Sequence, residues 1–432
     1  MMQQGLRVGT VFGIPLYVRA SWFPIVVFLA VLKGELWYET YGWSVSIAAA
    51  AGVVGSISLF TSVLLHEIGH SLVAKTQGIT VRSISLFLLG GVAEIDRESR
   101  TPGAAFQVAI AGPAVSLLLA IGFTAIAHQL DATVTPLSVI IRDLAQLNLV
   151  LCLFNLIPAL PLDGGQVLKA AVWQLTGDWL QGMRYAVASG QMLGSLAIGL
   201  GLFGVLTLPG FGVGLWLALV GWFIVRNAAA YGRVTSMQGL LLELQASPVM
   251  TQRFRVVDAG MTIREFTDRY ILCELADTPL FGTDVPYFAA AHGRYRGQLQ
   301  TKGWQAIDRA RWETTRIEAI VSPLLQVPHV RETTPLVEVI RTLEQNHLRF
   351  VVVLSPADTV AGTIDRADIT QALGKRLDWS IPEEEIQRIR REARYPSYLR
   401  IDTIAAAIEA SEPNEPNDIA DLFAALFKRP TS

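Results

Sequence analysis

The chain has 432 residues, of which 51% are hydrophobic and 17% are charged, and its formal net charge is −2. A soluble protein carries about 25% charged residues, so this composition argues against a wholly soluble protein. The small net charge gives no indication of a nucleic-acid partner.

The charged residues are concentrated in the second part of the chain. Residues 1–245 hold only 12 of the 35 Lys and Arg residues and 11 of the 37 Asp and Glu residues. We therefore expect an apolar membrane domain over residues 1–235, a linker over 236–246 and a soluble region after it.

Several apolar segments are long enough to cross a bilayer, which takes roughly 20 residues of helix. We expect six spans at about 20–38, 44–74, 104–129, 136–157, 185–208 and 212–231. Lys33 interrupts the first segment, which could also be read as an uncleaved signal anchor. Six spans would leave both termini on one side of the membrane.

The basic residues of the short loops indicate which side that is. One set of loops and the outer ends of the first and last spans carry Arg7, Arg19, Lys75, Arg82, Arg97, Arg100, Lys169, Arg184, Arg226 and Arg233. Lys33 is the basic residue assigned to the opposite side. By the positive-inside tendency, we expect an inner-membrane protein whose termini and soluble region are cytoplasmic.

The second expected span contains the sequence His66-Glu-Ile-Gly-His70. Two histidines four residues apart lie on one face of a helix, where both can bind one Zn²⁺. Glu67 between them can act as a base. The alternative is that each histidine is a packed, hydrogen-bonded residue or part of an ion path.

Residues 82–95 are too short to span the membrane as a helix. Ser and apolar residues alternate at first, and Gly90-Gly91 then supplies a hairpin-type turn, so we expect a β-hairpin. Unpaired strand edges are not tolerated in lipid, so this hairpin must be sheltered by protein or lie beside water. An amphipathic surface loop is the alternative.

A catalytic zinc usually has three protein ligands, and Asp163 is the candidate for the third. It follows two prolines that stop the fourth span and precedes a pair of glycines. A cation would offset the cost of a carboxylate at membrane depth. Asp163 could instead only cap a helix, and Asn155 could only satisfy a broken helix end.

With both motifs in place, residues 5–235 resemble the site-2 protease family of intramembrane zinc metalloproteases. His66–His70 match its zinc motif, and residues 155–164 match its Asn-x-x-Pro-x-x-Pro-x-Asp-Gly element. The resemblance implies a polytopic helical membrane domain that holds one Zn²⁺ through His66, His70 and Asp163. It also implies that Glu67 is catalytic and that Asn155 orients the substrate or its oxyanion.

The expected activity is hydrolysis of a peptide bond within or near the transmembrane segment of a single-span protein. A transmembrane helix pairs its own backbone groups, so several substrate residues must unwind before cleavage. The unwound segment could add as a strand along the 82–95 hairpin. A metal-ion transporter and a catalytically silent membrane scaffold are the competing interpretations.

The soluble region over residues 247–375 resembles a tandem CBS domain. In the second unit, a helix from Pro335 is followed by strands over 349–354 and 360–365 and by a further helix near Asp368. The first unit runs from Ser247 through Gly297. Such units pair into one disc, which could also join two chains as a homodimer.

CBS pairs often bind adenine nucleotides through a Gly-x-x-Thr-x-x-Asp signature. Gly362 and Asp368 match it, but Asp365 replaces the hydroxyl residue and would repel phosphate. In the first unit, Gln300 and Gly303 follow Gly297 at the corresponding positions. Nucleotide regulation and a purely structural or dimerising module are both open. Residues 376–432 are expected to form a helical and flexible tail.

Overall fold

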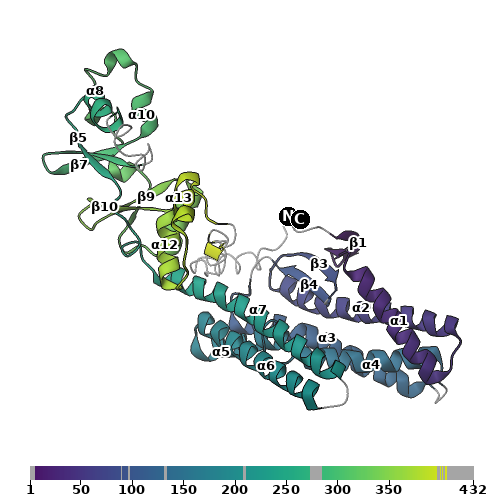
Figure 1. Cartoon of the computed structure of the whole chain (residues 1–432). Helices are drawn as coiled ribbons and strands as arrows, with labels where there is room; N and C mark the ends of the chain where they lie inside the picture. Colours follow the sequence, from purple (N-terminus) through teal and green to yellow (C-terminus); the bar gives the residue numbers. More distant parts are fainter. Residues whose placement is uncertain are drawn as a thin grey trace, which may run out of the picture. The chain divides into compact units, whose positions relative to one another are not determined.

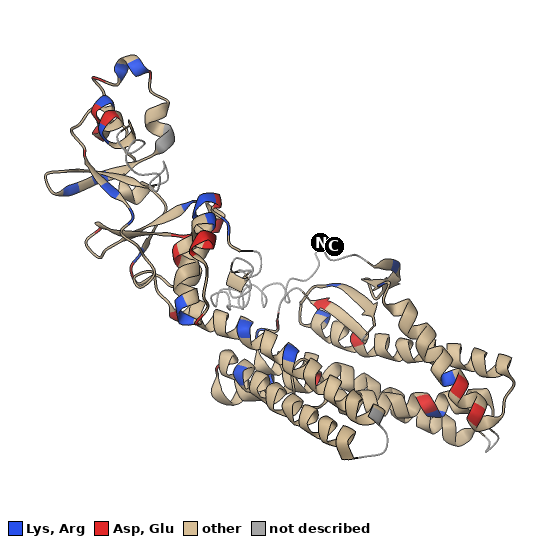
Figure 2. Ribbon diagram, in the orientation of Figure 1, with Lys and Arg blue, Asp and Glu red and all other residues tan. Residues whose placement is uncertain are grey.

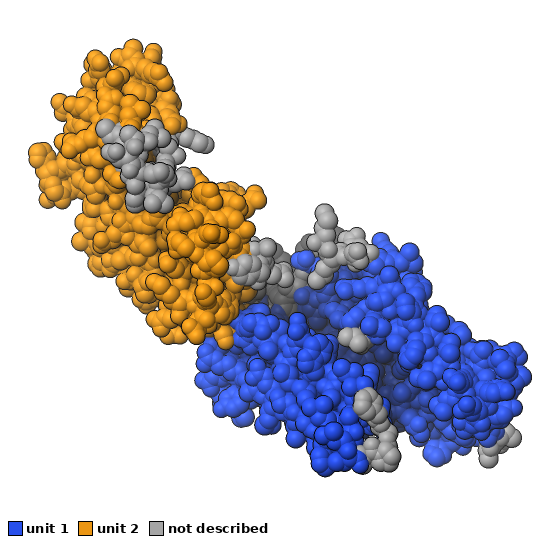
Figure 3. All heavy atoms as spheres, viewed as in Figure 1, with its two compact units in different colours: residues 1–235, 410–432 blue, residues 236–409 orange. Residues whose placement is uncertain are grey.

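We analysed a computed structural model of the whole chain. It describes residues 5–405 except 89, 96–97, 131–133, 208–210, 273–284, 397–398, 400 and 402–403. The described chain divides into two compact units, one that ends at Thr235 and one that begins at Ser236 (Figure 3). The expected tail beyond residue 405, including the helix expected at its end, lies outside the described residues.

The first unit is a bundle of long apolar helices (Figure 1). Its helices are α1 (Trp22–Tyr41), α2 (Val45–Thr76), α3 (Pro102–Gln129), α4 (Pro136–Asn155), α5 (Asp163–Thr176), α6 (Trp179–Thr207) and α7 (Phe211–Glu243). Within the described residues, five of these are long and apolar enough to cross a membrane: α2, α3, α4, α6 and α7. Figure 2 shows how few charged residues they carry. These five match the last five expected spans.

Two of these helices begin with the same Thr-Pro pair. Thr101 precedes α3, and its hydroxyl accepts a hydrogen bond from the backbone N–H of Ala104. Thr135 precedes α4 and forms a reciprocal capping box with Ser138. Because proline fits the first helical position and the threonine satisfies an unpaired N–H, each pair fixes where its helix starts.

The first expected span forms the 20-residue helix α1, but it is not among the five apolar helices because it carries Lys33, Glu35 and Glu39. Its lysine is nevertheless partly buried in the bundle, where it forms an ion pair with Asp143 of α4. The Lys33 ammonium also lies 5.4 Å from the centre of the Trp37 ring. Trp37 packs into an apolar cluster with residues of α2 and α4.

The first unit also contains a four-stranded sheet with the strand order β1-β2-β3-β4. Its strands are β1 (Leu6–Val11), β2 (Ile14–Val18), β3 (Val81–Phe87) and β4 (Gly90–Ile95). The expected hairpin is therefore β3–β4, and β1–β2 extends it through the parallel pair β2–β3. The expectation that Gly90 and Gly91 form the turn was wrong. Both glycines lie in β4, because Phe87 pairs with Gly90 and Leu86 with Gly91.

The second unit contains two three-stranded sheets with the same topology. The first has β5 (Arg255–Asp258), β6 (Tyr287–Ala291) and β7 (Arg294–Leu299), with the helices α8 (Ile263–Phe266) and α10 (Thr301–Gln305). The second has β8 (His329–Arg331), β9 (Phe350–Leu354) and β10 (Val360–Asp365), with α11 (Leu336–Gln345) and α12 (Arg366–Arg376). In each sheet the first two strands are parallel and the last two antiparallel.

The two sheets are joined by an exchange of short segments. Thr251, which precedes β5, pairs with Thr363 of β10 in the second sheet, through two backbone hydrogen bonds of 2.9 Å. Ser322, which precedes β8, pairs in the same way with Gln298 of β7 in the first sheet. The segment that leads into each repeat therefore completes the sheet of the other repeat.

Helices at both ends of the second unit pack on its second repeat. Residues 236–243, expected to belong to a linker, continue α7, and Met237 and Leu241 are buried with α11 and β9 in the largest apolar cluster of the unit. At the other end, the helix expected after residue 381 is α13 (Glu383–Glu392). Its Ile386 and Ile389 are buried against Ala367 of α12.

The ion pair between α1 and α4 provides a test of this packing. Lys33→Met or Asp143→Leu alone should destabilise the protein by about 1–3 kcal/mol, because each leaves one partly buried charge without its partner. The double variant should recover most of that loss, since it leaves no buried charge. Thermal unfolding of the purified protein in detergent measures this. A double variant no more stable than the weaker single variant would contradict a direct pairing.

Candidate metal centre

Three electron-rich atoms converge between α2 and α5. Nε2 of His66 lies 3.2 Å from Nε2 of His70, as expected for neighbours one helical turn apart. Oδ2 of Asp163, the first residue of α5, lies 3.1 Å from Nε2 of His66 and 3.3 Å from Nε2 of His70. Both histidines are buried and the aspartate is half-buried. This is the one such group of possible metal ligands within the described residues.

The spacing of these atoms suits a zinc ion. Nitrogen and oxygen ligands lie about 2.0–2.1 Å from a tetrahedral zinc, which places them about 3.3 Å from one another. The three measured distances, 3.1, 3.2 and 3.3 Å, agree with that value. A two-histidine, one-carboxylate set also leaves a fourth position open, as catalytic zinc sites require.

Gly112 of α3 leaves the space that such an ion needs. A Cβ atom at this position would lie 2.1 Å from Nε2 of His70 and 2.6 Å from Nε2 of His66. Any side chain there would therefore collide with the atoms that face the ion. The neighbouring helix approaches the centre closely without filling it.

The outer nitrogen of each histidine is held by α3. Nδ1 of His70 donates a hydrogen bond of 2.7 Å to the backbone carbonyl of Val108, which leaves the lone pair on Nε2. Nδ1 of His66 lies 2.9 Å from the hydroxyl of Ser116, which is fully buried. Such outer partners fix the orientation of a ligating histidine and raise its basicity. Sequence reasoning missed both partners.

Glu67 lies beside the edge strand β4. Its side chain packs so closely on Gly91 that a Cβ atom there would lie 2.5 Å from Cγ of Glu67. The backbone of Ala93 in the same strand faces the Glu67 carboxylate. β4 ends the four-stranded sheet, so one edge of this strand has no partner strand among the described residues.

Asn155 is less closely tied to this centre. It ends α4, and residues 156–162 lead from it to Asp163. In the described part of the chain, no hydrogen bond or ion pair joins the Asn155 side chain to the three converging residues. Its expected role in catalysis stays a prediction.

Two curated proteins named "Putative zinc metalloprotease" resemble most of this chain. Protein sll0528 of Synechocystis is 38% identical over 372 residues, which cover 86% of this chain and 96% of the relative. The model of peptidase family M50 matches residues 54–141 and 128–198 of this chain. The chain belongs to peptidase family M50. Rip3 of Mycobacterium tuberculosis is 30% identical to this M50 peptidase over 378 residues, which cover 86% of the chain and 93% of the relative.

A second family model matches the soluble region. The model of the CBS domain matches residues 317–375. Among solved structures, the site-2 protease from Methanocaldococcus jannaschii is 29% identical, with a TM-score of 0.37, and the match covers 52% of this chain and 94% of that one. The family assignment and the apolar helices make the M50 peptidase an integral membrane zinc metalloprotease with a CBS domain, as the sequence predicted.

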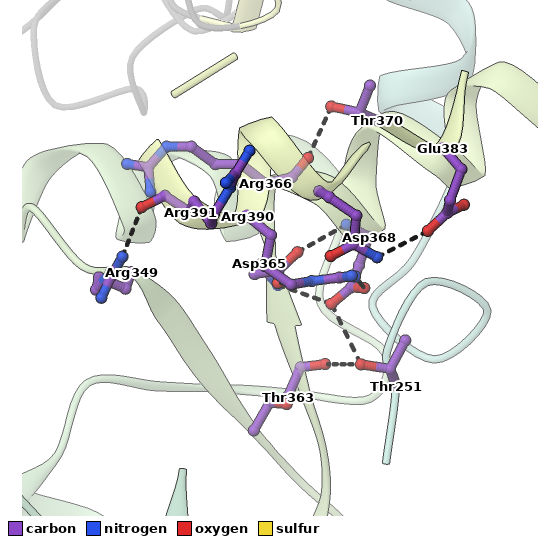
Figure 4. A network of polar contacts seen from close by, with 11 residues as sticks. Thr251, Arg349, Thr363, Asp365, Arg366, Asp368, Thr370, Glu383, Arg390 and Arg391 are labelled. Atoms are coloured by element: carbon purple, nitrogen blue, oxygen red, sulfur yellow. Dashed lines mark hydrogen bonds and ion pairs between the residues drawn. The ribbon is translucent and has the colours of Figure 1, made fainter. Parts of the chain in front are cut away.

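Asp368, one of the two residues expected to bind a nucleotide, lies in a polar network in the second unit (Figure 4). Asp365 ends β10, and Asp368 lies in the first turn of α12. Arg390 of α13 joins them, with its Nε 2.9 Å from Oδ2 of Asp365 and its Nη2 3.0 Å from Oδ1 of Asp368. The hydroxyl of Thr251 donates to Asp368 as well.

This network does not fit the nucleotide that the signature suggests. Gly362 and Asp368 are in place, but the Asp368 carboxylate already binds Arg390 and Thr251. Asp365 adds a second negative charge where the signature has a hydroxyl group, and it also binds Arg390. A phosphate group would meet two carboxylates and one guanidinium group here, and their net negative charge disfavours phosphate binding.

The hydrogen bond from α3 to His66 predicts a role for Ser116 in metal affinity. Ser116→Ala should weaken zinc binding by about 10-fold, because outer partners of zinc ligands contribute 10- to 100-fold. Competition with a chelator measures this. Ser71→Ala is the matched control, since Ser71 is also buried and its hydroxyl has no hydrogen-bond partner among the described residues. Equal zinc affinities in the two variants would contradict the role of Ser116.

The acidic network predicts a pH-dependent stability. Burial and the neighbouring Asp365 raise the pKa of Asp368 from its ordinary 3.8 to about 6, although Arg390 and Thr251 oppose the shift. Because this pKa is raised, the ionisation of Asp368 costs stability, and the loss develops as the pH rises from about 4 to about 6. Asp368→Asn removes this dependence.

The stability of Asp368→Asn relative to the unmodified protein should therefore rise between pH 4 and pH 7. The rise should be at most about 3 kcal/mol, since the pKa of Asp368 is raised from 3.8 to about 6. Thermal unfolding of the second unit within the intact protein measures this difference at each pH. A difference that does not change with pH would contradict the raised pKa.

Proposed function

We propose that His66, His70 and Asp163 hold one zinc ion, and that this centre hydrolyses a peptide bond within or near the transmembrane segment of a single-span membrane protein. The observation that carries the proposal is the convergence of the three side chains at zinc-ligand spacing, with Gly112 leaving the space open. His66 and His70 lie on a helix apolar enough to cross a membrane, so the bond to be cleaved is brought to membrane depth.

Each residue has a separate role in this proposal. When bound, zinc would supply a Lewis acid that polarises a carbonyl and activates water. The Glu67 carboxylate takes a proton from the attacking water and passes it to the leaving amide nitrogen. Ser116 and the Val108 carbonyl orient the two imidazoles. Asn155 would donate a hydrogen bond from its side-chain amide to the developing oxyanion.

The substrate would bind as an added strand along β4. A segment that unwinds from a transmembrane helix loses its internal hydrogen bonds, and an edge strand can replace them. β4 ends its sheet, and its Gly91 lies against Glu67. A strand paired there would pass beside the proposed base, so substrates with helix-weakening residues would be favoured.

We propose that α1 is a sixth span, which would place both termini and the CBS domain in the cytoplasm, at the inner membrane of the cell. The ion pair with Asp143 neutralises Lys33, the basic residue that interrupts this helix, and so lowers the cost of embedding it. The basic residues of the short loops then face the cytoplasm.

The proposed topology can be tested with single cysteines in a variant without Cys152 and Cys273. A cysteine at Gly42, between α1 and α2, should react with a membrane-impermeant maleimide in intact cells. A cysteine at Gly177, between α5 and α6, should react only after lysis. Labelling of the cysteine at position 177 in intact cells would contradict the proposed orientation.

We propose that the second unit is a tandem CBS pair that regulates the protease. The repeated topology and the exchanged segments support a tandem CBS pair, of which the family model matches the second repeat. Regulation of proteolysis through this pair and assembly of a homodimer through it are the proposed functions. A single molar mass for the detergent-solubilised protein that equals one chain would exclude the dimer.

The proposed centre predicts opposite effects of two substitutions on zinc and on cleavage. Glu67→Gln should retain about one zinc per chain but lower cleavage by about 10²- to 10⁴-fold, since it removes only the proton acceptor. Asp163→Ala should lose zinc, because it removes a ligand. Elemental analysis measures the zinc, and proteomics of membranes from cells with either protein measures the accumulated single-span fragments.

Glu39→Gln is the matched control, because Glu39 is an acid of α1 in the same unit and has no proposed role. It should keep both the zinc and the activity. Undiminished cleavage by Glu67→Gln would remove this residue from the mechanism. Zinc transport that persists in Glu67→Gln, with no fragments accumulating, would favour the transporter instead.

A further inference from the structure

The helix α13 is held on the second CBS repeat by contacts at three places. Its Ile386 and Ile389 are buried against Ala367 of α12. Near its end, Arg390 spans the two carboxylates of Asp365 and Asp368. These contacts join a helix that follows the CBS repeat to the residues where the nucleotide signature lies.

The third contact provides a hydrogen-bond donor for a backbone carbonyl group at the end of α13. Nη2 of Arg349, just before β9, donates a hydrogen bond of 2.7 Å to the backbone carbonyl of Arg391 (Figure 4). The last carbonyl groups of a helix have no partner within it, so a cationic donor there stabilises the helix end. Arg349 of the repeat thus donates to α13, and Arg390 of α13 donates to the repeat.

The two carboxylates need a cation between them. Asp368 is almost fully buried, with 3% of its side chain exposed, and Asp365 is 20% exposed. Two carboxylates this close disfavour each other's charged form, and burial increases that cost. Arg390 is 17% exposed, and its planar group meets one oxygen of each acid. A guanidinium group is suited to this two-point contact, whereas the point charge of a lysine is less so.

We propose that Asp365 and Asp368 form a guanidinium-binding site that docks the chain's own helix α13, and that this site takes the place of a nucleotide site in the second CBS repeat. The same substitution accounts for both properties. An aspartate at position 365, where the signature has a hydroxyl residue, adds the charge that repels phosphate and the second oxygen that holds Arg390.

The docked helix also closes the polar site to solvent. Arg390 covers Asp368, which in turn accepts hydrogen bonds from Thr251 and from the backbone N–H of Asp365. Asp365 accepts a hydrogen bond from the backbone N–H of Asp368. A ribose could reach these carboxylates only if α13 left its position. The position of α13, and not a bound ligand, therefore determines whether these carboxylates are accessible.

Hydrogen exchange of the full chain in detergent tests the proposal. Arg390→Met should speed the exchange of the α13 backbone amides at least about tenfold, because the helix loses its charged anchor. The amides of β9 and β10 should exchange at the unmodified rate, which reports that the repeat stays folded. Arg388→Met is the matched control on the same helix, because Arg388 pairs only with Glu385 in the described part of the chain. It should leave α13 unchanged.

Equal exchange of α13 in Arg390→Met and the unmodified protein, or an equal acceleration in Arg388→Met, would overturn the docking site. If Arg390→Met unfolds the repeat, the triple variant with Asp365→Asn and Asp368→Asn removes the unpaired charges. It should restore β9 and β10 but leave α13 fast. A slow α13 in the triple variant would show that the apolar contacts alone hold the helix.

The second half of the proposal is tested by hydrogen exchange of the full chain with AMP or ATP at millimolar concentration. Neither should change the exchange of residues 360–368 in the unmodified protein, since Arg390 occupies both carboxylates. Protection of these residues, or faster exchange of α13 on addition of either nucleotide, would overturn the second half of the proposal. Protection confined to residues 287–303 would place a nucleotide at the first repeat and leave the proposal intact.

Discussion

Two imidazole nitrogens and one carboxylate oxygen, all within 3.3 Å of one another, face a common point between two helices of an apolar bundle. Because these atoms carry lone pairs or negative charge, they favour a cation at that point. Several elements of the first unit bring these groups to the common point. α2 supplies both histidines, the turn after α4 brings Asp163 to the start of α5, and the sheet places its edge strand beside Glu67.

The helix α3 contributes to the centre without providing a ligand. Val108, Gly112 and Ser116 recur every four residues along it, so they lie on one face. The first and last of them hold the outer nitrogens of His70 and His66, and the glycine between them keeps the space in front of the inner nitrogens open. A single helix face thus sets both the direction of the imidazoles and the open space in front of them.

Sequence patterns predicted the features that depend on local spacing. The positions of His66 and His70 follow from one helical turn, and five of the six spans follow from apolar length. Features that depend on how helices cross were missed: the contact of Ser116 with His66 and the pairing of Lys33 with Asp143 across 110 residues. Charges within apolar segments were the available signal for that pair. The glycines of β4 were misassigned as a turn, because register is set by strand pairing.

The exchange of segments in the second unit has a consequence for how such a region can be inherited. Each sheet is completed by a few residues that precede the other repeat, through Thr251 on one side and Ser322 on the other. A gene segment that encodes one repeat alone would carry a strand edge without its neighbour and a leading segment without its sheet. Duplication, loss or transfer between proteins should therefore involve both repeats together, even though the second alone is recognisable by its family pattern.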